Sequence, residues 1–178
     1  MNARKVPRST IRTARLILRP TSAHDARRAF EIQRDCDVTR MLNTSFPPIR
    51  QEVEDWFSSH ESEWAAGTAY RFAIEHWQHM IGIVDVDSIV GSEGSLGYWL
   101  ERSSWGNGFA FEAAQALIRL VFQEVGLSRL TSGHAFDNPA SGRVLTKLGF
   151  TQIEGAEIFL RSRGQTILQQ RYVLDCDS

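Results

Sequence analysis

The sequence predicts an α/β (α+β) protein with a mixed, mostly antiparallel sheet of about seven strands and helices on both faces. Two observations lead to this class. The predicted elements follow the order strand, two helices, three strands, helix, strand, helix, two strands. One long apolar helix, over residues 108–125, gives a single β-α-β crossover to a parallel neighbour. No internal repeat or linker interrupts the 178 residues, so we expect a basic arm over residues 1–12 and one domain over residues 13–178.

The first predicted elements are a strand and two helices. Residues 15–19 form the strand. Ser22 and Asp25 have the spacing of a capping box, which predicts that the first helix begins there. Residues 50–66 place apolar and aromatic side chains at helical spacing and form the second helix.

The remaining elements alternate between strands and helices. The long helix has a buried face of Ala, Leu, Ile and Val, and Gly126 ends it. The other expected elements are strands over residues 70–75, 80–87, 95–100 and 128–135, a helix over 138–147, and a final hairpin of 157–161 with 166–174.

The composition excludes several classes of function. Lys and Arg number 20 and Asp and Glu 21, so no overall field attracts nucleic acid or an anionic membrane. Cys36 and Cys176 have no metal-ligand spacing and indicate a reducing compartment. No apolar run approaches the ~20 residues that span a bilayer, and the start of the chain lacks a secretory core. We therefore expect a cytoplasmic protein.

The stretch WGNGFAFE, residues 105–112, places two glycines at the start of the long helix. The first turn of a helix has unpaired N–H groups and a partial positive charge, and glycines let an anion approach the backbone. Phosphate is the natural anion for such a site. A P-loop is excluded because no G-x-x-x-x-G-K-S/T occurs, and a dinucleotide fingerprint is excluded because Phe111 stands where its third glycine belongs.

Three ordered motifs resemble the GNAT acetyltransferases, in particular the RimJ/RimL branch of ribosomal-protein N-terminal acetyltransferases. They are GYWL over residues 97–100, WGNGFA over 105–110, and NPASGRVLTKLGF over 138–150. RLILRP over 15–20 is similar to the first strand of that branch. The resemblance extends from about residue 13 to 174 and implies the GNAT fold.

The resemblance identifies the anion as the pyrophosphate of acetyl-CoA, with no metal required. The family motif Q/R-x-x-G-x-G/A falls on Trp105, Gly108 and Ala110, and Trp105 departs from it. It also implies direct attack by the amine in a ternary complex. The expected coenzyme-binding residues are Tyr98, Trp99, Leu100, Trp105, Gly106, Asn107, Gly108, Phe109, Ala110, Asn138 and Ser141.

Acetyl transfer needs a proton donor for the departing thiolate and a base for the amine. By resemblance Ser141 is the donor. The branch often has Glu where this chain has Ser95, so the base stays open. Glu93 shares a strand face with Ser95, and His134 has a pKa suited to neutral pH. Asp85, Asp87 and a water chain are the alternatives.

The acceptor implied by this branch is a protein N-terminal amine. A small amine, such as a polyamine, an amino acid or an aminoglycoside, is the alternative within the same chemistry. A module that binds acyl-CoA without catalysis is the alternative from another class. The branch also implies a homodimer.

Overall fold

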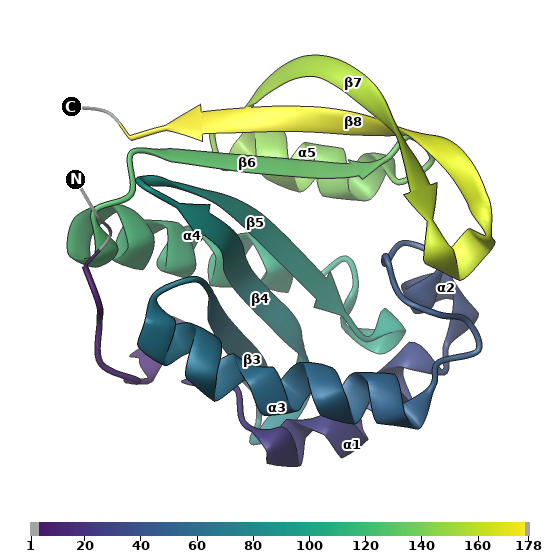
Figure 1. Cartoon of the computed structure of the whole chain (residues 1–178), viewed down its shortest axis with the longest axis horizontal. Helices are drawn as coiled ribbons and strands as arrows, with labels where there is room; N and C mark the ends of the chain where they lie inside the picture. Colours follow the sequence, from purple (N-terminus) through teal and green to yellow (C-terminus); the bar gives the residue numbers. More distant parts are fainter. Residues whose placement is uncertain (1–3, 177–178) are drawn as a thin grey trace.

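The computed structural model describes residues 4–176 and has one eight-stranded sheet in the order β1-β2-β3-β4-β5-β6-β8-β7 (Figure 1). Every neighbouring pair is antiparallel except β5 and β6, which confirms the predicted mixed sheet with one crossover. The strands are β1 (Ile11–Arg12), β2 (Ile17–Pro20), β3 (Tyr70–His76), β4 (His79–Val90), β5 (Glu93–Leu100), β6 (Arg129–Ala135), β7 (Thr151–Leu160) and β8 (Gln165–Asp175).

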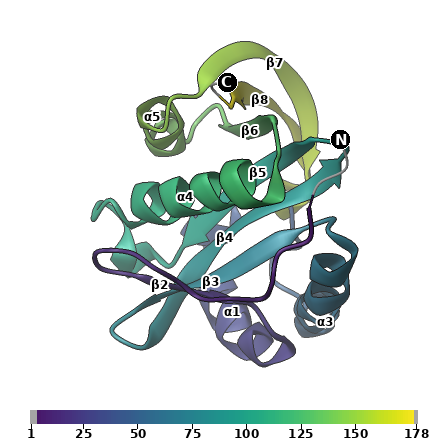
Figure 2. The same ribbon diagram turned by 90° about the vertical axis from the view of Figure 1, so that its left-hand side faces the viewer.

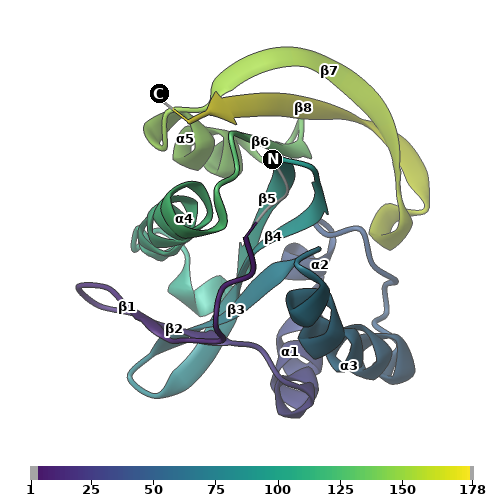
Figure 3. The same ribbon diagram turned by 60° about the vertical axis from the view of Figure 1, so that its left-hand side comes forward.

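Helices cover both faces of the sheet, as Figures 2 and 3 show. Helices α4 and α5 lie on one face, and α1 and α3 lie on the other (Figure 3). The α-helices are α1 (Ala26–Gln33), α2 (Cys36–Thr39), α3 (Arg50–Ala66), α4 (Phe109–Leu120) and α5 (Pro139–Lys147). Short 3₁₀ turns are η1 (Ala23–Asp25), η2 (Arg102–Ser104) and η4 (Arg161–Arg163), and a π-helical segment, η3 (Val121–Val125), continues α4.

Helix α4 forms because its apolar residues fall on one side of a 3.6-residue period. Ala113, Ala114 and Leu117 are fully buried against the sheet, in the larger of the two main core clusters. The helix starts after Gly108 and its π-helical continuation closes at Gly126, both with positive φ. This helix therefore holds the glycine segment rigidly at one end of the sheet.

The smaller main cluster lies on the other face. It joins α1 and α3 to β3 and β4 through Ala29, Phe57, Ala73 and Ile83, and Trp99 of β5 packs at its edge. The sheet is therefore anchored on both faces at its β3–β4 half.

Strands β5 and β6 separate after a short contact. They share three residue pairs, Glu93 to Ser95 with Arg129 to Thr131. Ser132 Oγ still donates to the Leu96 carbonyl at 2.8 Å, and beyond this point the two strands diverge. The divergence opens a gap in the middle of the sheet, on the side where β5 ends.

Several elements differ from the sequence prediction. The sheet has eight strands because β1, with only two residues, pairs with β2. Strand β7 begins at Thr151 instead of residue 157, and α2 was not predicted. Two-residue strands and one-turn helices are too short for a periodic signal. Within residues 4–176, no helix is long and apolar enough to cross a membrane.

Residues 4–12 lie against the domain. Arg4 N–H donates to the Val125 carbonyl at 2.7 Å, and the Val6 carbonyl accepts from Trp64 Nε1 at 2.9 Å. Val6 and Ile11 pack against the larger core cluster. The segment therefore bridges the end of α4 and the α3 side of the sheet.

Candidate active site

A cavity of about 460 Å³ lies where β5 and β6 separate. This volume is within the range of small-molecule sites. It is bounded by the end of β5, the glycine segment, the first turns of α4 and α5, and residues of α2 and the segment after it. The predicted residues that line it are Tyr98, Trp99, Leu100, Trp105, Gly106, Gly108, Phe109, Ala110, His134, Asn138 and Ser141.

The glycine segment presents bare backbone at the N-terminus of α4. Gly106 and Gly108 both have φ of 77°, a conformation that favours glycine. Gly108 is the N-cap and has no side chain to accept from the first-turn amides. A Cβ at Gly106 would meet nothing within 4 Å. These bare amides and the helix dipole fit a pyrophosphate.

Arg15 and Glu112 brace this segment from outside. Glu112 accepts from Arg15 N at 2.8 Å, Arg15 Nε at 2.7 Å and Thr13 Oγ1 at 2.6 Å. Arg15 Nη1 then donates to the Asn107 carbonyl at 3.0 Å, and its guanidinium lies 4.8 Å from the centre of the Phe109 ring. This brace could not be predicted from sequence patterns because its two residues lie 97 positions apart.

The side chains of Trp105 and Asn107 form hydrogen bonds within the loop between β5 and α4. Trp105 Nε1 donates to the Leu100 carbonyl at 2.9 Å. Asn107 Nδ2 donates to the Ser104 and Trp105 carbonyls at 3.2 and 3.0 Å, and Asn107 does not line the cavity. Both side chains close the turn between β5 and α4.

Tyr98 and Ser141 form a hydroxyl pair on the α5 side of the gap. Tyr98 Oη lies 2.8 Å from Ser141 Oγ and donates to the Ser141 carbonyl at 3.0 Å. Burial raises the pKa of Tyr98 to about 12, although the hydrogen bond with Ser141 opposes that rise. Tyr98 is therefore protonated at neutral pH, and the pair can pass a proton to a group in the cavity.

Asn138 and His134 are tied to the protein around them. Asn138 caps α5 by accepting from Ser141 N, and Pro139 occupies the first helical position. His134 Nδ1 lies 2.8 Å from the Ala135 carbonyl, and Nε2 lies 3.3 Å from Tyr172 Oη. His134 thus reaches the cavity wall with both ring nitrogens engaged.

Glu93 is not brought to the cavity. It begins β5 beside Arg129, whereas the cavity lies at Leu100, the other end of the strand. Seven residues at ~3.3 Å per residue separate the two ends by roughly 23 Å. Strand alternation identified its face correctly but carries no information on position along the strand.

The wall opposite α5 is apolar and was not predicted. Val38, Met41 and Leu42 line the cavity there. Arg163 holds this wall: its Nη2 lies 3.3 Å from the Met41 sulfur and 2.9 Å from Asp137 Oδ1.

A second arginine ties the β7–β8 turn to the segment before α3. Arg161 Nη2 donates to Ser45 Oγ at 2.7 Å and to Glu52 Oε1 at 3.0 Å. Hydrogen bonds from Ser45 and Arg161 hold the pKa of Glu52 below its usual range. We call the contacts of Arg161 and Arg163 the clasp. Of the residues in the clasp, Met41 lines the cavity.

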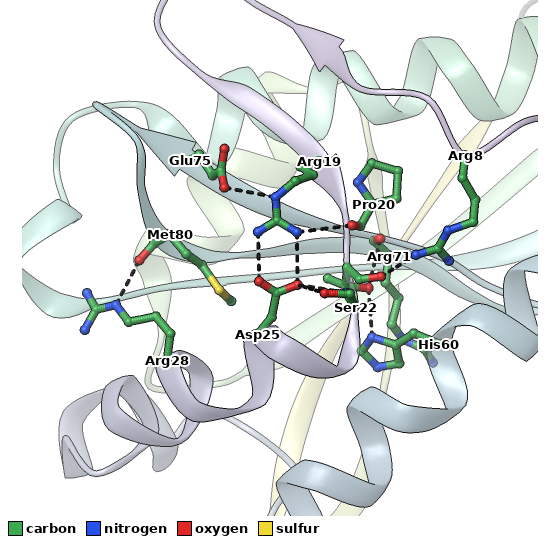
Figure 4. A network of polar contacts seen from close by, with 11 residues as sticks. Arg8, Arg19, Pro20, Ser22, Asp25, Arg28, His60, Arg71, Glu75 and Met80 are labelled. Atoms are coloured by element: carbon green, nitrogen blue, oxygen red, sulfur yellow. Dashed lines mark hydrogen bonds and ion pairs between the residues drawn. The ribbon is translucent and has the colours of Figure 1, made fainter.

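A polar network at the edge of the sheet positions α1 (Figure 4). Arg19 donates to Asp25 at 2.8 and 3.1 Å and to Glu75 at 3.0 Å. Asp25 also accepts from Ser22 N at 2.8 Å, which confirms the predicted capping box. Burial pushes the pKa of Asp25 upward, but hydrogen bonds from Arg19 and Ser22 outweigh it and lower that pKa. Arg19, Ser22, Asp25 and Glu75 do not line the cavity.

The chain matches a family model described as an acetyltransferase (GNAT) domain over residues 15–151. It is 30% identical over 163 residues to the uncharacterized N-acetyltransferase p20 of Bacillus licheniformis, covering 89% of this chain and 91% of that one. It is 26% identical over 172 residues to the [ribosomal protein uS5]-alanine N-acetyltransferase of Escherichia coli, covering 90% and 87%.

Among solved structures, the fold is similar to RimL, a ribosomal L7/L12 alpha-N-protein acetyltransferase in complex with coenzyme A. The TM-score is 0.85 at 19% identity, covering 95% of this chain and 99% of that one. The chain belongs to the GNAT acetyltransferase family. It is an acetyl-CoA-dependent N-acetyltransferase with the GNAT fold. In the described part of the chain no group of three or more His, Cys, Asp or Glu side chains could hold a metal ion.

Proposed function

We propose that this N-acetyltransferase modifies the N-terminal α-amine of a polypeptide. The observation that carries the proposal is the clasp. Arg161 and Arg163 bridge the β7–β8 turn to the segment around Met41 and Glu52. Because Met41 lines the cavity, this bridge would bound the entrance beside it. A bounded entrance admits a free chain end more readily than an internal loop of a folded protein.

A group of exposed apolar side chains on β7, on β8 and just after β6 also favours a peptide. Phe136, Phe159 and Leu168 are 57%, 58% and 45% exposed, and Phe136 N donates to the Leu168 carbonyl at 3.0 Å. Such side chains suit contacts with the residues that follow a terminal amine. The names of the uS5-alanine enzyme and of RimL agree with an N-terminal acceptor for those two relatives.

The site supports transfer by direct attack. The bare amides from Gly106 to Ala110 would hold the pyrophosphate of acetyl-CoA, and its acyl arm would enter the gap between β5 and β6. Backbone N–H groups of β5 that face the gap would stabilise the oxyanion. Ser141, supported by Tyr98, would give a proton to the coenzyme thiolate as the C–S bond breaks.

The test is release of free thiol from acetyl-CoA with a panel of acceptors. The panel contains peptides with varied N-terminal residues, the same peptides with blocked N-termini and an internal lysine, and polyamines. Turnover with free N-termini alone is the expected result. Turnover with polyamines or amino acids alone would instead establish a small-molecule acceptor, and tight acetyl-CoA binding without turnover would favour a sensor.

Three further properties belong to this proposal. The reducing-compartment composition and the ribosomal-protein relatives support a cytoplasmic location. The resemblance to the RimJ/RimL branch supports a homodimer, which light scattering of the purified protein would test. The near-zero net charge argues against nucleic acid and membrane partners.

A further inference from the structure

Two glycines occupy corresponding positions on β5 and β6, just beyond the last paired residues. Strands β5 and β6 pair with an offset of 36 residues, as in Glu93 with Arg129 and Ser95 with Thr131. The same register, extended by two residues, places Gly97 opposite Gly133. One residue further on, Tyr98 and His134 point toward α5, because Tyr98 Oη reaches Ser141 and His134 lies against Gly142. The glycines therefore belong to the other face of the sheet, the α3 face.

A polar side chain from the neighbouring strand covers each glycine. Asp85 on β4 is paired with Gly97, and its Oδ1 lies 2.5 Å from where a Cβ of Gly97 would be. Gln169 on β8, two residues from Arg171, which pairs with Gly133, has its Cδ 2.8 Å from the position of a Cβ of Gly133. Any side chain at either glycine would displace these groups. The gap on the α3 face thus has a carboxylate on one flank and a carboxamide on the other.

Arg71 fixes the orientation of Asp85. Arg71 Nε lies 3.3 Å from Asp85 Oδ2, which leaves Oδ1 as the oxygen over Gly97. The guanidinium is itself held by Glu63, by Asp87 at 3.4 Å and by the Trp56 ring, 5.3 Å from its centre. Only 7% of the Arg71 side chain is exposed, so the arrangement is built into the face of the sheet.

The two sides of the gap therefore carry complementary groups. The hydroxyl pair of Tyr98 and Ser141 lies on the α5 side, where the coenzyme sulfur is expected. Asp85 on β4 lies on the opposite face, where it pairs with Gly97, the residue before Tyr98 on β5. An amine that reaches an acyl group in the gap from the α3 face would pass over Gly97 and Gly133.

We propose that Asp85 is the general base of acetyl transfer, and that the acceptor amine binds over Gly97 and Gly133 between Asp85 and Gln169. The proposal rests on the N-acetyltransferase function above and holds for any amine acceptor. It assigns the base to β4. Ser95, the position at which the resembled branch often has Glu, lies on the neighbouring strand β5.

The surroundings of Asp85 support this role. Burial, together with the charge of Asp87, raises the pKa of Asp85 to about 7 against the opposing effect of Arg71. Among the facing groups, Glu63 on α3 shares Arg71. His60 on α3 is held neutral because burial and the charge of Arg71 lower its pKa to about 3. A base with a pKa near the working pH is the effective kind.

Asp85 takes one proton from the ammonium of the acceptor, and the freed lone pair attacks the thioester carbon. The C–N bond forms and the C–S bond breaks. Ser141 gives its proton to the thiolate and takes a second proton from the nitrogen in its place. Asp85 later releases its proton to water.

The test compares Asp85→Asn with Asp87→Asn, measured as kcat/KM against pH for two amines of different pKa. In the wild type, kcat/KM should fall below pH of about 7, at the same pH for both amines. Asp85→Asn should lose at least ~100-fold at pH 7, and its break should move to the pKa of whichever amine is supplied. Asp87→Asn should keep the break and shift it to lower pH, because a neighbouring negative charge is removed.

Two further measurements separate a catalytic role from a structural one. The acetyl-CoA dissociation constant of Asp85→Asn should match that of Asp87→Asn, and its melting temperature should be no lower, since Arg71 keeps two carboxylate partners in each and a buried charge is removed at Asp85. Adding Ser95→Glu to Asp85→Asn should recover tenfold or more, because Ser95 is on the same face, opposite Asp87.

The outcomes distinguish this inference from the proposed function. A wild type that acetylates polyamines but no peptide would refute the proposed acceptor, and the Asp85 comparison would then be read on the polyamine. An Asp85→Asn variant within fivefold of wild type at pH 7, or one that keeps a break that does not follow the amine, would overturn the inference. A wild type that binds acetyl-CoA and acetylates nothing would overturn both.

Discussion

Glu112→Gln tests whether the brace on the glycine segment contributes to stability and coenzyme binding together. The Glu112 carboxylate, 15% exposed, accepts three hydrogen bonds from Thr13 and Arg15. Glutamine retains one oxygen for Thr13 and the Arg15 backbone but turns an NH₂ toward the guanidinium. Charged hydrogen bonds contribute ~1.5–3 kcal/mol. Because Arg15 is 48% exposed, screening reduces the expected loss to about 1–2 kcal/mol.

For a domain of this size, that loss lowers the melting temperature by roughly 3–6 °C. The loss should also depend on pH. Burial raises the pKa of Glu112, but hydrogen bonds from Thr13 and Arg15 outweigh it, so its folded-state pKa lies below the ordinary value. The carboxylate therefore stabilises the fold above pH of about 4.5, and this contribution disappears as the pH falls further. Wild type and variant should converge as the pH falls through this lowered pKa.

Thermal unfolding followed by circular dichroism at pH 7 and pH 3.5 measures this effect, and calorimetric titration gives the acetyl-CoA affinity. The affinity should weaken about three- to tenfold, because Arg15 no longer holds the Asn107 carbonyl. Glu54→Gln is the control, since Glu54 is 48% exposed and its closest approach to Arg50 is 3.9 Å. A melting temperature within 1 °C of wild type, or a difference that persists in acid, would refute the reasoning.

Three other predictions concern the coenzyme, the chemistry and the core. Ser141→Ala should lower kcat by ~100-fold while the acetyl-CoA affinity stays within threefold, as stopped-flow thiol detection and calorimetry would measure; an unchanged kcat would assign the proton to another donor. Gly106→Ala and Gly126→Ala should each cost about 1 kcal/mol, since both have positive φ and open space at the Cβ. Only Gly106→Ala should weaken acetyl-CoA binding, and equal affinities in both would contradict the pyrophosphate site. Leu117→Ala should lower the free energy of unfolding in urea by ~2–5 kcal/mol, because Leu117 is fully buried; a loss below 1 kcal/mol would contradict its place in the core.

The sequence was informative wherever a local pattern determines the structure. Helix α4 has a long apolar period, the Ser22–Asp25 capping box has a fixed spacing, and the glycines at 106 and 108 mark a positive-φ turn. Asn138 also lies at the N-cap of α5, as its residue type and position predicted.

Contacts between distant residues could not be predicted. The pairing of Arg15 with Glu112 and the clasp depend on which strands and loops become neighbours in the fold. Glu93 illustrates the limit, because alternation places it on a face and leaves its distance from the chemistry open. Asp85 is one of several alternative bases in the sequence, and its position beside Gly97 depends on how β4 pairs with β5.

The short contact between β5 and β6 also divides the sheet mechanically. Within residues 4–176, three residue pairs of β5 and β6 connect the part of the sheet that contains β1 to β5 with the part that contains β6 to β8. Cooperative opening should therefore begin at this seam, where amide hydrogens would exchange earlier than those of β3 or β4. The arm of the coenzyme, held in the gap, would contact both strands where β5 and β6 do not pair with each other. We therefore expect the two parts of the sheet to unfold as one cooperative unit when acetyl-CoA is bound, and less cooperatively when it is not.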